Sequence, residues 1–263
     1  MTTDERAFLA AIRDQPDEDT PRLVYADWLT EHGRPDRADF IRVEIELART
    51  PPTTEADERR RRVLFERRAE LLKRYKTEWL APFAPYAKGS AFDRGFVSAL
   101  EVPANAFLQE ADRWFALAPL TRVKFTTCYD RDPATGSLTW WTEPLFSAPH
   151  LSRLESIDLT ALQLIAADVE RLTGHPNLSR LRELTLVWNE LRNEGATALA
   201  TMPQLRGLRV LDLRSNLITD TGARAIAESP YLDQLSELRL SRNPIRNRGW
   251  ERLKERFGLA LVG

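Results

Sequence analysis

The sequence is poor in the residues that most often carry catalysis, metals or covalent cross-links. Its 263 residues include one cysteine, Cys128, and three histidines, His32, His150 and His175. A single thiol excludes an intrachain disulfide and fits a reducing compartment, so we expect a cytoplasmic protein. No histidine stands at a metal-site spacing from another histidine or from the cysteine, and we therefore expect no metal.

Long apolar runs and a large excess of charge are also missing. No hydrophobic stretch approaches the ~18 residues that span a bilayer, and we expect no membrane partner. The formal net charge of −1 gives no general attraction to nucleic acid. Neither a glycine-rich phosphate loop nor a G-x-S-x-G nucleophile motif occurs, so we expect no cofactor and no enzyme.

The sequence does contain a repeat of 27 residues. Residues 181–199 (LRELTLVWNELRNEGATAL), 208–226 (LRVLDLRSNLITDTGARAI) and 235–253 (LSELRLSRNPIRNRGWERL) share the frame Leu-x-x-Leu-x-Leu-x-x-Asn. An Asn or Asp stands four residues after the frame asparagine, and a glycine follows two residues later. Three copies at a constant period predict one structural unit that is repeated along the chain.

Each copy is expected to form a strand, a turn and a helix. The leucines at frame positions 4 and 6 alternate as a short strand requires. The frame asparagines can donate and accept hydrogen bonds, so we expect them to bind the backbone where each strand ends; they are Asn189, Asn216 and Asn243. We expect the following Asn193, Asp220 and Asn247 to be helix N-caps. No single coil can bury its leucines, so the coils must stack.

The frame continues upstream with less fidelity, in coils that start at Leu154, Leu120 and Val97. Cys128 occupies the frame asparagine position of the coil that starts at Leu120, and we expect it to be buried. Uneven spacing indicates an insertion near residues 130–150. The sequence thus predicts about six coils over residues 81–263, with a last short strand at Leu259–Val262.

Residues 1–80 predict a small all-α N-terminal unit. Its expected helices cover residues 4–14, 20–32 (with Thr20 as the cap), 36–49 and 55–76 (with Thr54 as the cap and Asp57 completing a capping box). Residues 1–50 carry seven arginines against twelve acids, whereas residues 51–76 carry nine basic residues against five acids. Helix 55–76 could therefore dock onto the acidic helices or bind nucleic acid, and its interleaved glutamates favour the first explanation.

Two resemblances agree with this division. The 27-residue frame resembles the leucine-rich repeat, in the strand–helix variety typified by ribonuclease inhibitor. The segment DTPRLVYADWLTEHGRPDRADFIRVEIEL resembles the repeat-companion domain at the N-terminus of bacterial leucine-rich repeat proteins. Together they imply an α/β fold, a leucine-rich repeat solenoid preceded by the all-α unit. The companion domain implies no reaction.

Trp188 interrupts the otherwise regular frame and raises the question of a binding surface. Frame positions 3, 5 and 7 face away from the leucines, and position 8 lies at the edge of that face, so stacking lines these positions up in columns. Tryptophan and arginine often dominate interfaces. The candidate partner-binding residues are Asp158, Thr160, Thr185, Val187, Trp188, Asp212, Arg214, Arg239 and Arg242. Trp188 could equally pack against a neighbouring coil or against Trp140 and Trp141 of the insertion.

The expected function is a non-enzymatic scaffold that binds a protein partner through the concave sheet face of the repeats. Two alternatives stay open. One is a regulatory or enzymatic site in the 130–150 insertion, and the other is nucleic-acid binding through helix 55–76. The sequence fixes neither the partner nor the oligomeric state.

Overall fold

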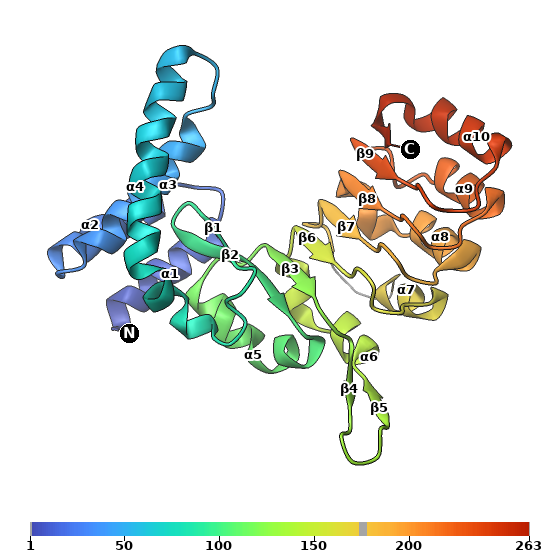
Figure 1. The fold of residues 1–263 in the computed structure, drawn as a ribbon, viewed down its shortest axis with the longest axis horizontal. Coiled ribbons are helices and arrows are strands. Elements are labelled where there is room, and N and C mark those ends of the chain that lie inside the picture. The colour runs from blue at the N-terminus through green and yellow to red at the C-terminus, as the bar shows by residue number, and fades with distance from the viewer. Residues whose placement is uncertain (1, 174–177, 263) are drawn as a thin grey trace. The chain divides into compact units, whose positions relative to one another are not determined.

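The computed structural model describes residues 2–173 and 178–262 (Figure 1). The chain divides into two compact units. The first comprises Met1–Leu100 and Asp112–Leu120, and the second comprises Glu101–Ala111 and Thr121–Gly263.

The first unit contains the helices predicted for the N-terminal region. They are α1 (Thr3–Asp14), α2 (Thr20–Glu31), α3 (Pro35–Arg49), α4 (Glu55–Leu80) and the short 3-10 helix η1 (Ala81–Phe83). The predicted capping box is confirmed, since Thr54 and Asp57 each bind the other's backbone N–H. Thr20 as the N-cap of α2 is wrong by one residue, because the carbonyl of Asp19 already accepts the first helical bond, from Leu23 (3.0 Å).

A hairpin extends this unit beyond the boundary expected near residue 80. Strands β1 (Ala91–Asp93) and β2 (Phe96–Val102) pair antiparallel. The Phe96 ring lies 6.0 Å from that of Tyr25, inside the core of α1, α2 and α3. Gly95 must be glycine here, because it has φ +86° and an added Cβ would lie 2.6 Å from Ile41.

The basic helix α4 is held to α3 by ion pairs. Arg60 binds Glu46 (2.6 Å), Arg67 binds Asp39 (2.7 Å), and Arg68 binds the largely buried Glu44. These arginines satisfy acids of the same unit, as the intramolecular explanation of the charge contrast requires.

The second unit is built from parallel strands and helices. The strands pair in the order β3 (Arg122–Phe125), β6 (Ser156–Asp158), β7 (Glu183–Thr185), β8 (Val210–Asp212), β9 (Glu237–Arg239) and β10 (Leu261–Val262). A helix follows each of β6, β7, β8 and β9, and these helices are α7 (Ala166–Thr173), α8 (Arg192–Ala200), α9 (Asp220–Ala227) and α10 (Asn247–Phe257). Figure 1 shows these helices in one layer and the strands in another. The predicted last strand is confirmed at Leu261–Val262, where β10 pairs with β9, whereas Leu259 lies in the preceding 3-10 helix (Gly258–Ala260).

The remaining elements connect or interrupt these coils. They are α5 (Ala104–Leu117), the insertion hairpin β4 (Tyr129–Arg131) and β5 (Leu138–Trp140), α6 (Thr142–Phe146), and the 3-10 helices η2 (Pro149–Arg153), η3 (Pro203–Gly207) and η4 (Gly258–Ala260). None of the helices in the described ranges is both long and apolar enough to cross a bilayer.

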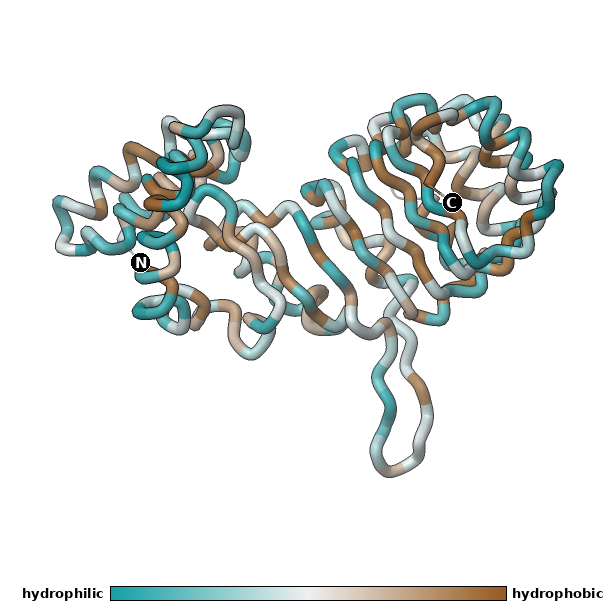
Figure 2. Tube along the Cα trace, turned by 45° about the horizontal axis from the view of Figure 1, so that its top comes forward, coloured by the Kyte–Doolittle hydropathy of each residue, from teal (hydrophilic) through white to brown (hydrophobic). Residues whose placement is uncertain are grey.

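The register of the repeats is the 27-residue period itself. Leu184 pairs with Leu211 and Leu211 with Leu238, and all three are fully buried. Apolar and polar residues alternate along these strands (Figure 2), so one face is core and the other is free for contacts. We call the face of the sheet that is free for contacts the strand face.

The frame asparagines bind the backbone, as predicted, and also join consecutive coils. Asn189 accepts hydrogen bonds from Leu162 N–H (3.1 Å) and Leu164 N–H (3.0 Å) of the preceding coil and donates to Leu159 O (3.0 Å). Asn216 donates to Leu186 O (2.8 Å). Asn243 accepts from Asn216 N–H (2.9 Å) and donates to Leu213 O (2.8 Å). Each of these amides therefore links two coils.

The predicted N-cap role of Asn193, Asp220 and Asn247 is wrong. Each lies within the first turn of its own helix, where no side-chain cap is formed. Two of them instead serve the next coil. Asn193 Oδ1 accepts from Thr219 N–H (2.9 Å) and Gly222 N–H (3.0 Å), and Asp220 Oδ1 accepts from Arg246 N–H (2.8 Å).

Cys128 occupies its frame position as a free thiol with no exposed surface. Burial raises its pKa to about 12. In the coil that starts at Val97, the frame asparagine position is occupied by Asn105, which lies in the first turn of α5 and donates to Asp130 (3.1 Å). The strand of that coil leads directly into a helix, so there is no turn for an amide to bind.

Candidate functional site

The nine residues predicted to bind a partner all lie on β6 to β9 or in the turns that follow these strands. One row crosses the sheet in strict register, from Asp158 through Thr185 and Asp212 to Arg239. Thr160, Val187 and Arg214 follow two residues after the first three members of that row. The structure therefore brings the predicted residues together on the strand face.

Trp188 is a surface residue. Its side chain is 60% exposed and its backbone has φ +57°. Ala161, Ser215 and Arg242 occupy the same frame position and share this left-handed conformation. The turn geometry thus directs position 8 away from the core in these four coils, and Trp188 has no stacking partner among the described aromatic rings.

The packing alternative for Trp188 involved the tryptophans of the insertion. Trp140 instead lies against Tyr129 of the paired strand, with ring centroids 5.1 Å apart. Trp141 donates its indole N–H to Asp130 (3.0 Å). Both are accounted for by contacts within or beside the hairpin.

Asp212 is the buried centre of a charge network. It has no exposed surface, and its carboxylate accepts two bonds from Arg214, at Nε (2.9 Å) and Nη2 (2.7 Å). Arg239 Nη1 also donates to it, at 3.3 Å. The bond to Asp212 raises the pKa of Arg214. Asp212 therefore orients two arginines and does not present its own charge to a partner.

Glu237 completes this network and was not among the predicted residues. Its carboxylate accepts from Arg239 Nε at 2.7 Å, and this bond raises the pKa of Arg239. The sequence did hold a signal for it. Residues two apart on a strand share a face, and residues 27 apart are neighbours across the sheet, so the opposite charges at 212, 214, 237 and 239 are a pattern from which pairing follows.

Arg242 differs from these two arginines. It is exposed, and it has no hydrogen-bond or ion-pair partner within residues 2–173 and 178–262. Together Arg214, Arg239 and Arg242 form what we call the arginine cluster.

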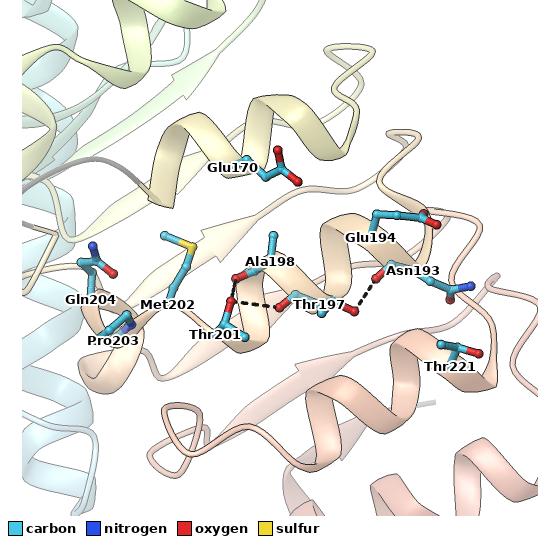
Figure 3. A pocket seen from close by; sticks show the side chains of 10 residues that line it. All are labelled: Glu170, Asn193, Glu194, Thr197, Ala198, Thr201, Met202, Pro203, Gln204 and Thr221. Atoms are coloured by element: carbon cyan, nitrogen blue, oxygen red, sulfur yellow. Dashed lines mark hydrogen bonds between the residues drawn. The ribbon is translucent and has the colours of Figure 1, made fainter.

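A hollow of 690 Å³ opens on the helix side, among α7, α8 and α9 (Figure 3). The hydroxyls of two lining threonines on or next to α8 bind their own helix. Thr197 donates to Asn193 O (2.8 Å) and Thr201 to Ala198 O (2.9 Å), as the dashed lines show. A binding pocket needs convergent polar groups that are free to meet a ligand, and these threonine hydroxyls are already engaged.

The insertion gives no comparable arrangement. Asp132 accepts hydrogen bonds from Ala134 N–H (2.7 Å) and Thr135 N–H (3.1 Å), which lower its pKa and close the hairpin turn. Within the described ranges, no three His, Cys, Asp or Glu side chains are placed to hold a metal ion. The ring of His32 stacks on that of Trp28, with centroids 4.1 Å apart, and His175 lies outside the described residues.

Comparison with known proteins agrees with the coil structure. Residues 178–200 and 205–227 match the family described as the leucine-rich repeat. These segments cover the coils of α8 and α9 and include Trp188, Asp212 and Arg214. The chain therefore contains leucine-rich repeats. A search of curated proteins found no match to the chain.

Proposed function

We propose that this protein is a non-enzymatic binding scaffold whose strand face recognises a protein partner. Leucine-rich repeats commonly mediate protein–protein binding, and the family match makes this the natural first function for the coils. The observation that carries the proposal is Trp188, a large side chain held 60% exposed by a left-handed turn beside the arginine cluster. Tryptophan and arginine are the residues that most often dominate the binding energy of interfaces.

The rest of the architecture belongs to the same proposal. The coils form a solenoid of the ribonuclease-inhibitor variety, and the N-terminal helices form a repeat-companion domain, as in bacterial proteins of this class. The free thiol of Cys128 supports a reducing, cytoplasmic setting. The ion pairs between α3 and α4 support a structural role for the basic helix over nucleic-acid binding.

Site-specific photocrosslinking tests the proposal. A benzophenone amino acid is placed at Thr185, on the strand face, and in a matched protein at Thr197, on the helix side. We expect a discrete adduct in native lysate from position 185 only. Adding Trp188→Ala and Arg242→Ala should abolish it, and circular dichroism checks the fold. Equal adducts from both positions, or an adduct that survives the double substitution, would contradict the proposal.

A further inference from the structure

We infer that the arginine cluster binds an acidic segment of the partner, with carboxylates on the arginines and a neighbouring apolar side chain on Trp188. This inference rests on the proposed function and names the chemistry that the strand face recognises. The cluster occupies the last two coils, on β8, β9 and the turns after them.

The two inner arginines are held in place before any partner arrives. Arg214 uses Nε and Nη2 on Asp212, which leaves Nη1 without a hydrogen-bond partner among the described residues. Arg239 donates from Nε to Glu237 and from Nη1 to Asp212, which leaves Nη2 without a hydrogen-bond partner among the described residues. Because the guanidinium is rigid and planar, fixing one edge fixes the direction of the remaining N–H groups. The side chains nevertheless stay 44% and 34% exposed, respectively, so a partner can reach them.

The outward charge of this region is positive. Asp212 and Glu237 both form ion pairs with arginines of the cluster, so these five groups carry three positive and two negative formal charges, a net charge of +1. Frame positions 7 and 8 contain no acid from Val187 to Arg242. The exposed acids of the preceding coil are Glu183, on β7, and Glu190, which lies 3.9 Å from Arg192. The uncompensated positive charge therefore lies at Arg242, and Arg214 and Arg239 add N–H groups that remain free to donate.

The neighbouring side chains favour a peptide over a nucleic acid. Thr185, Val187 and Trp188 continue the strand face as a neutral and partly apolar surface. A nucleic acid gains affinity by neutralising many phosphates along a basic track. Three arginines beside an apolar strip suit instead a short segment with a few carboxylates and one large apolar residue.

Fluorescence anisotropy with defined probes tests this inference. The probe is a fluorescein-labelled peptide that alternates glutamate pairs with leucine, compared with its lysine counterpart and a labelled oligothymidylate. Wild type should bind the glutamate peptide, and more weakly as salt is raised. Arg242→Ala should weaken binding about fivefold, the upper range for one exposed ion pair, and Arg242→Glu should weaken it further.

Arg248→Ala is the matched control, because Arg248 is an exposed arginine on α10 of the same coil with no partner in the described part of the chain. It should leave binding unchanged. The inference is overturned by no binding of the glutamate peptide, by equal binding of the lysine peptide, by tighter binding of oligothymidylate, or by an equal effect of Arg248→Ala. If crosslinking at Thr185 captures a partner while the glutamate peptide fails, only this inference falls. If no adduct forms at Thr185, the proposed function itself falls.

Discussion

Asn193 and Gly222 belong to consecutive coils, and the side-chain oxygen of the first accepts a hydrogen bond from the backbone N–H of the second at 3.0 Å. The same oxygen accepts from the backbone N–H and the hydroxyl of Thr219. One amide thus replaces the missing N-cap of α9, and the cap comes from the coil before it. Stacking and helix capping are therefore a single interaction in these repeats.

Asn193→Ala should destabilise the second unit by about 1–2 kcal/mol, the usual effect of losing a helix cap. Asn193→Asp keeps an oxygen acceptor, as Asp220 does for the following helix, and should retain most of the stability. Urea unfolding followed by circular dichroism measures both. Equal losses in the two variants would show that the acceptor oxygen is not what matters.

Gly222→Ala should destabilise the protein, although alanine normally favours a helix over glycine by about 1 kcal/mol. The added Cβ would lie 2.7 Å from Ile218 Cγ2 and 2.9 Å from Asn193 Oδ1. We expect a net loss of about 1–3 kcal/mol from this overpacking. The neighbouring exposed Thr221→Ala serves as the control and should be neutral or slightly stabilising. A gain in stability for Gly222→Ala would mean that the coils are further apart than described.

Trp188 gives a test that separates an exposed residue from a packed one. Because its φ is +57°, Trp188→Gly should be about 1 kcal/mol more stable than Trp188→Ala. Both variants should lose much less stability than the about 3–5 kcal/mol that follows removal of a core tryptophan. Thermal unfolding of the two variants and wild type measures this. A large loss of stability in both variants would show that Trp188 is packed in the core.

The fold could be predicted from the sequence because a period of 27 residues fixes both the strand register and the stacking. Buried leucines and frame asparagines follow from that period alone. The helix caps of the repeats could not be predicted, because a side chain near the start of its own helix also lies near the start of the next helix, and sequence spacing does not distinguish the two. Asp212 was predicted to bind a partner because sequence spacing places it on the strand face but does not show which side chains cover it. Its position on the strand face was right, but its burial beneath Arg214 depends on side-chain contacts across the strand.

The ion pair between α3 and α4 can be tested directly. Glu44 is 7% exposed, and its burial raises its pKa, while Arg68 donates to it. Arg68→Ala would leave a buried carboxylate without this partner and should cost about 1–3 kcal/mol in the first unit. The control is Arg59→Ala, an exposed arginine of the same helix without an ion-pair partner among the described residues, and it should be neutral. Equal, small effects would remove the structural explanation for the basic helix.

Cys128 makes the stability of the second unit depend on alkaline pH. Its thiol stays protonated in the folded state up to a pKa of about 12, whereas in the unfolded chain it ionises near the ordinary value of about 8.5. Between these values the unfolded state binds fewer protons, so the free energy of unfolding falls as pH rises. From pH 7.5 to 9.5 this one group should remove about 1.4 kcal/mol. Cys128→Ala lacks the ionisable thiol, so urea unfolding at both pH values should show a smaller fall by that amount. Identical falls would mean that the thiol is accessible and ionises in the folded protein.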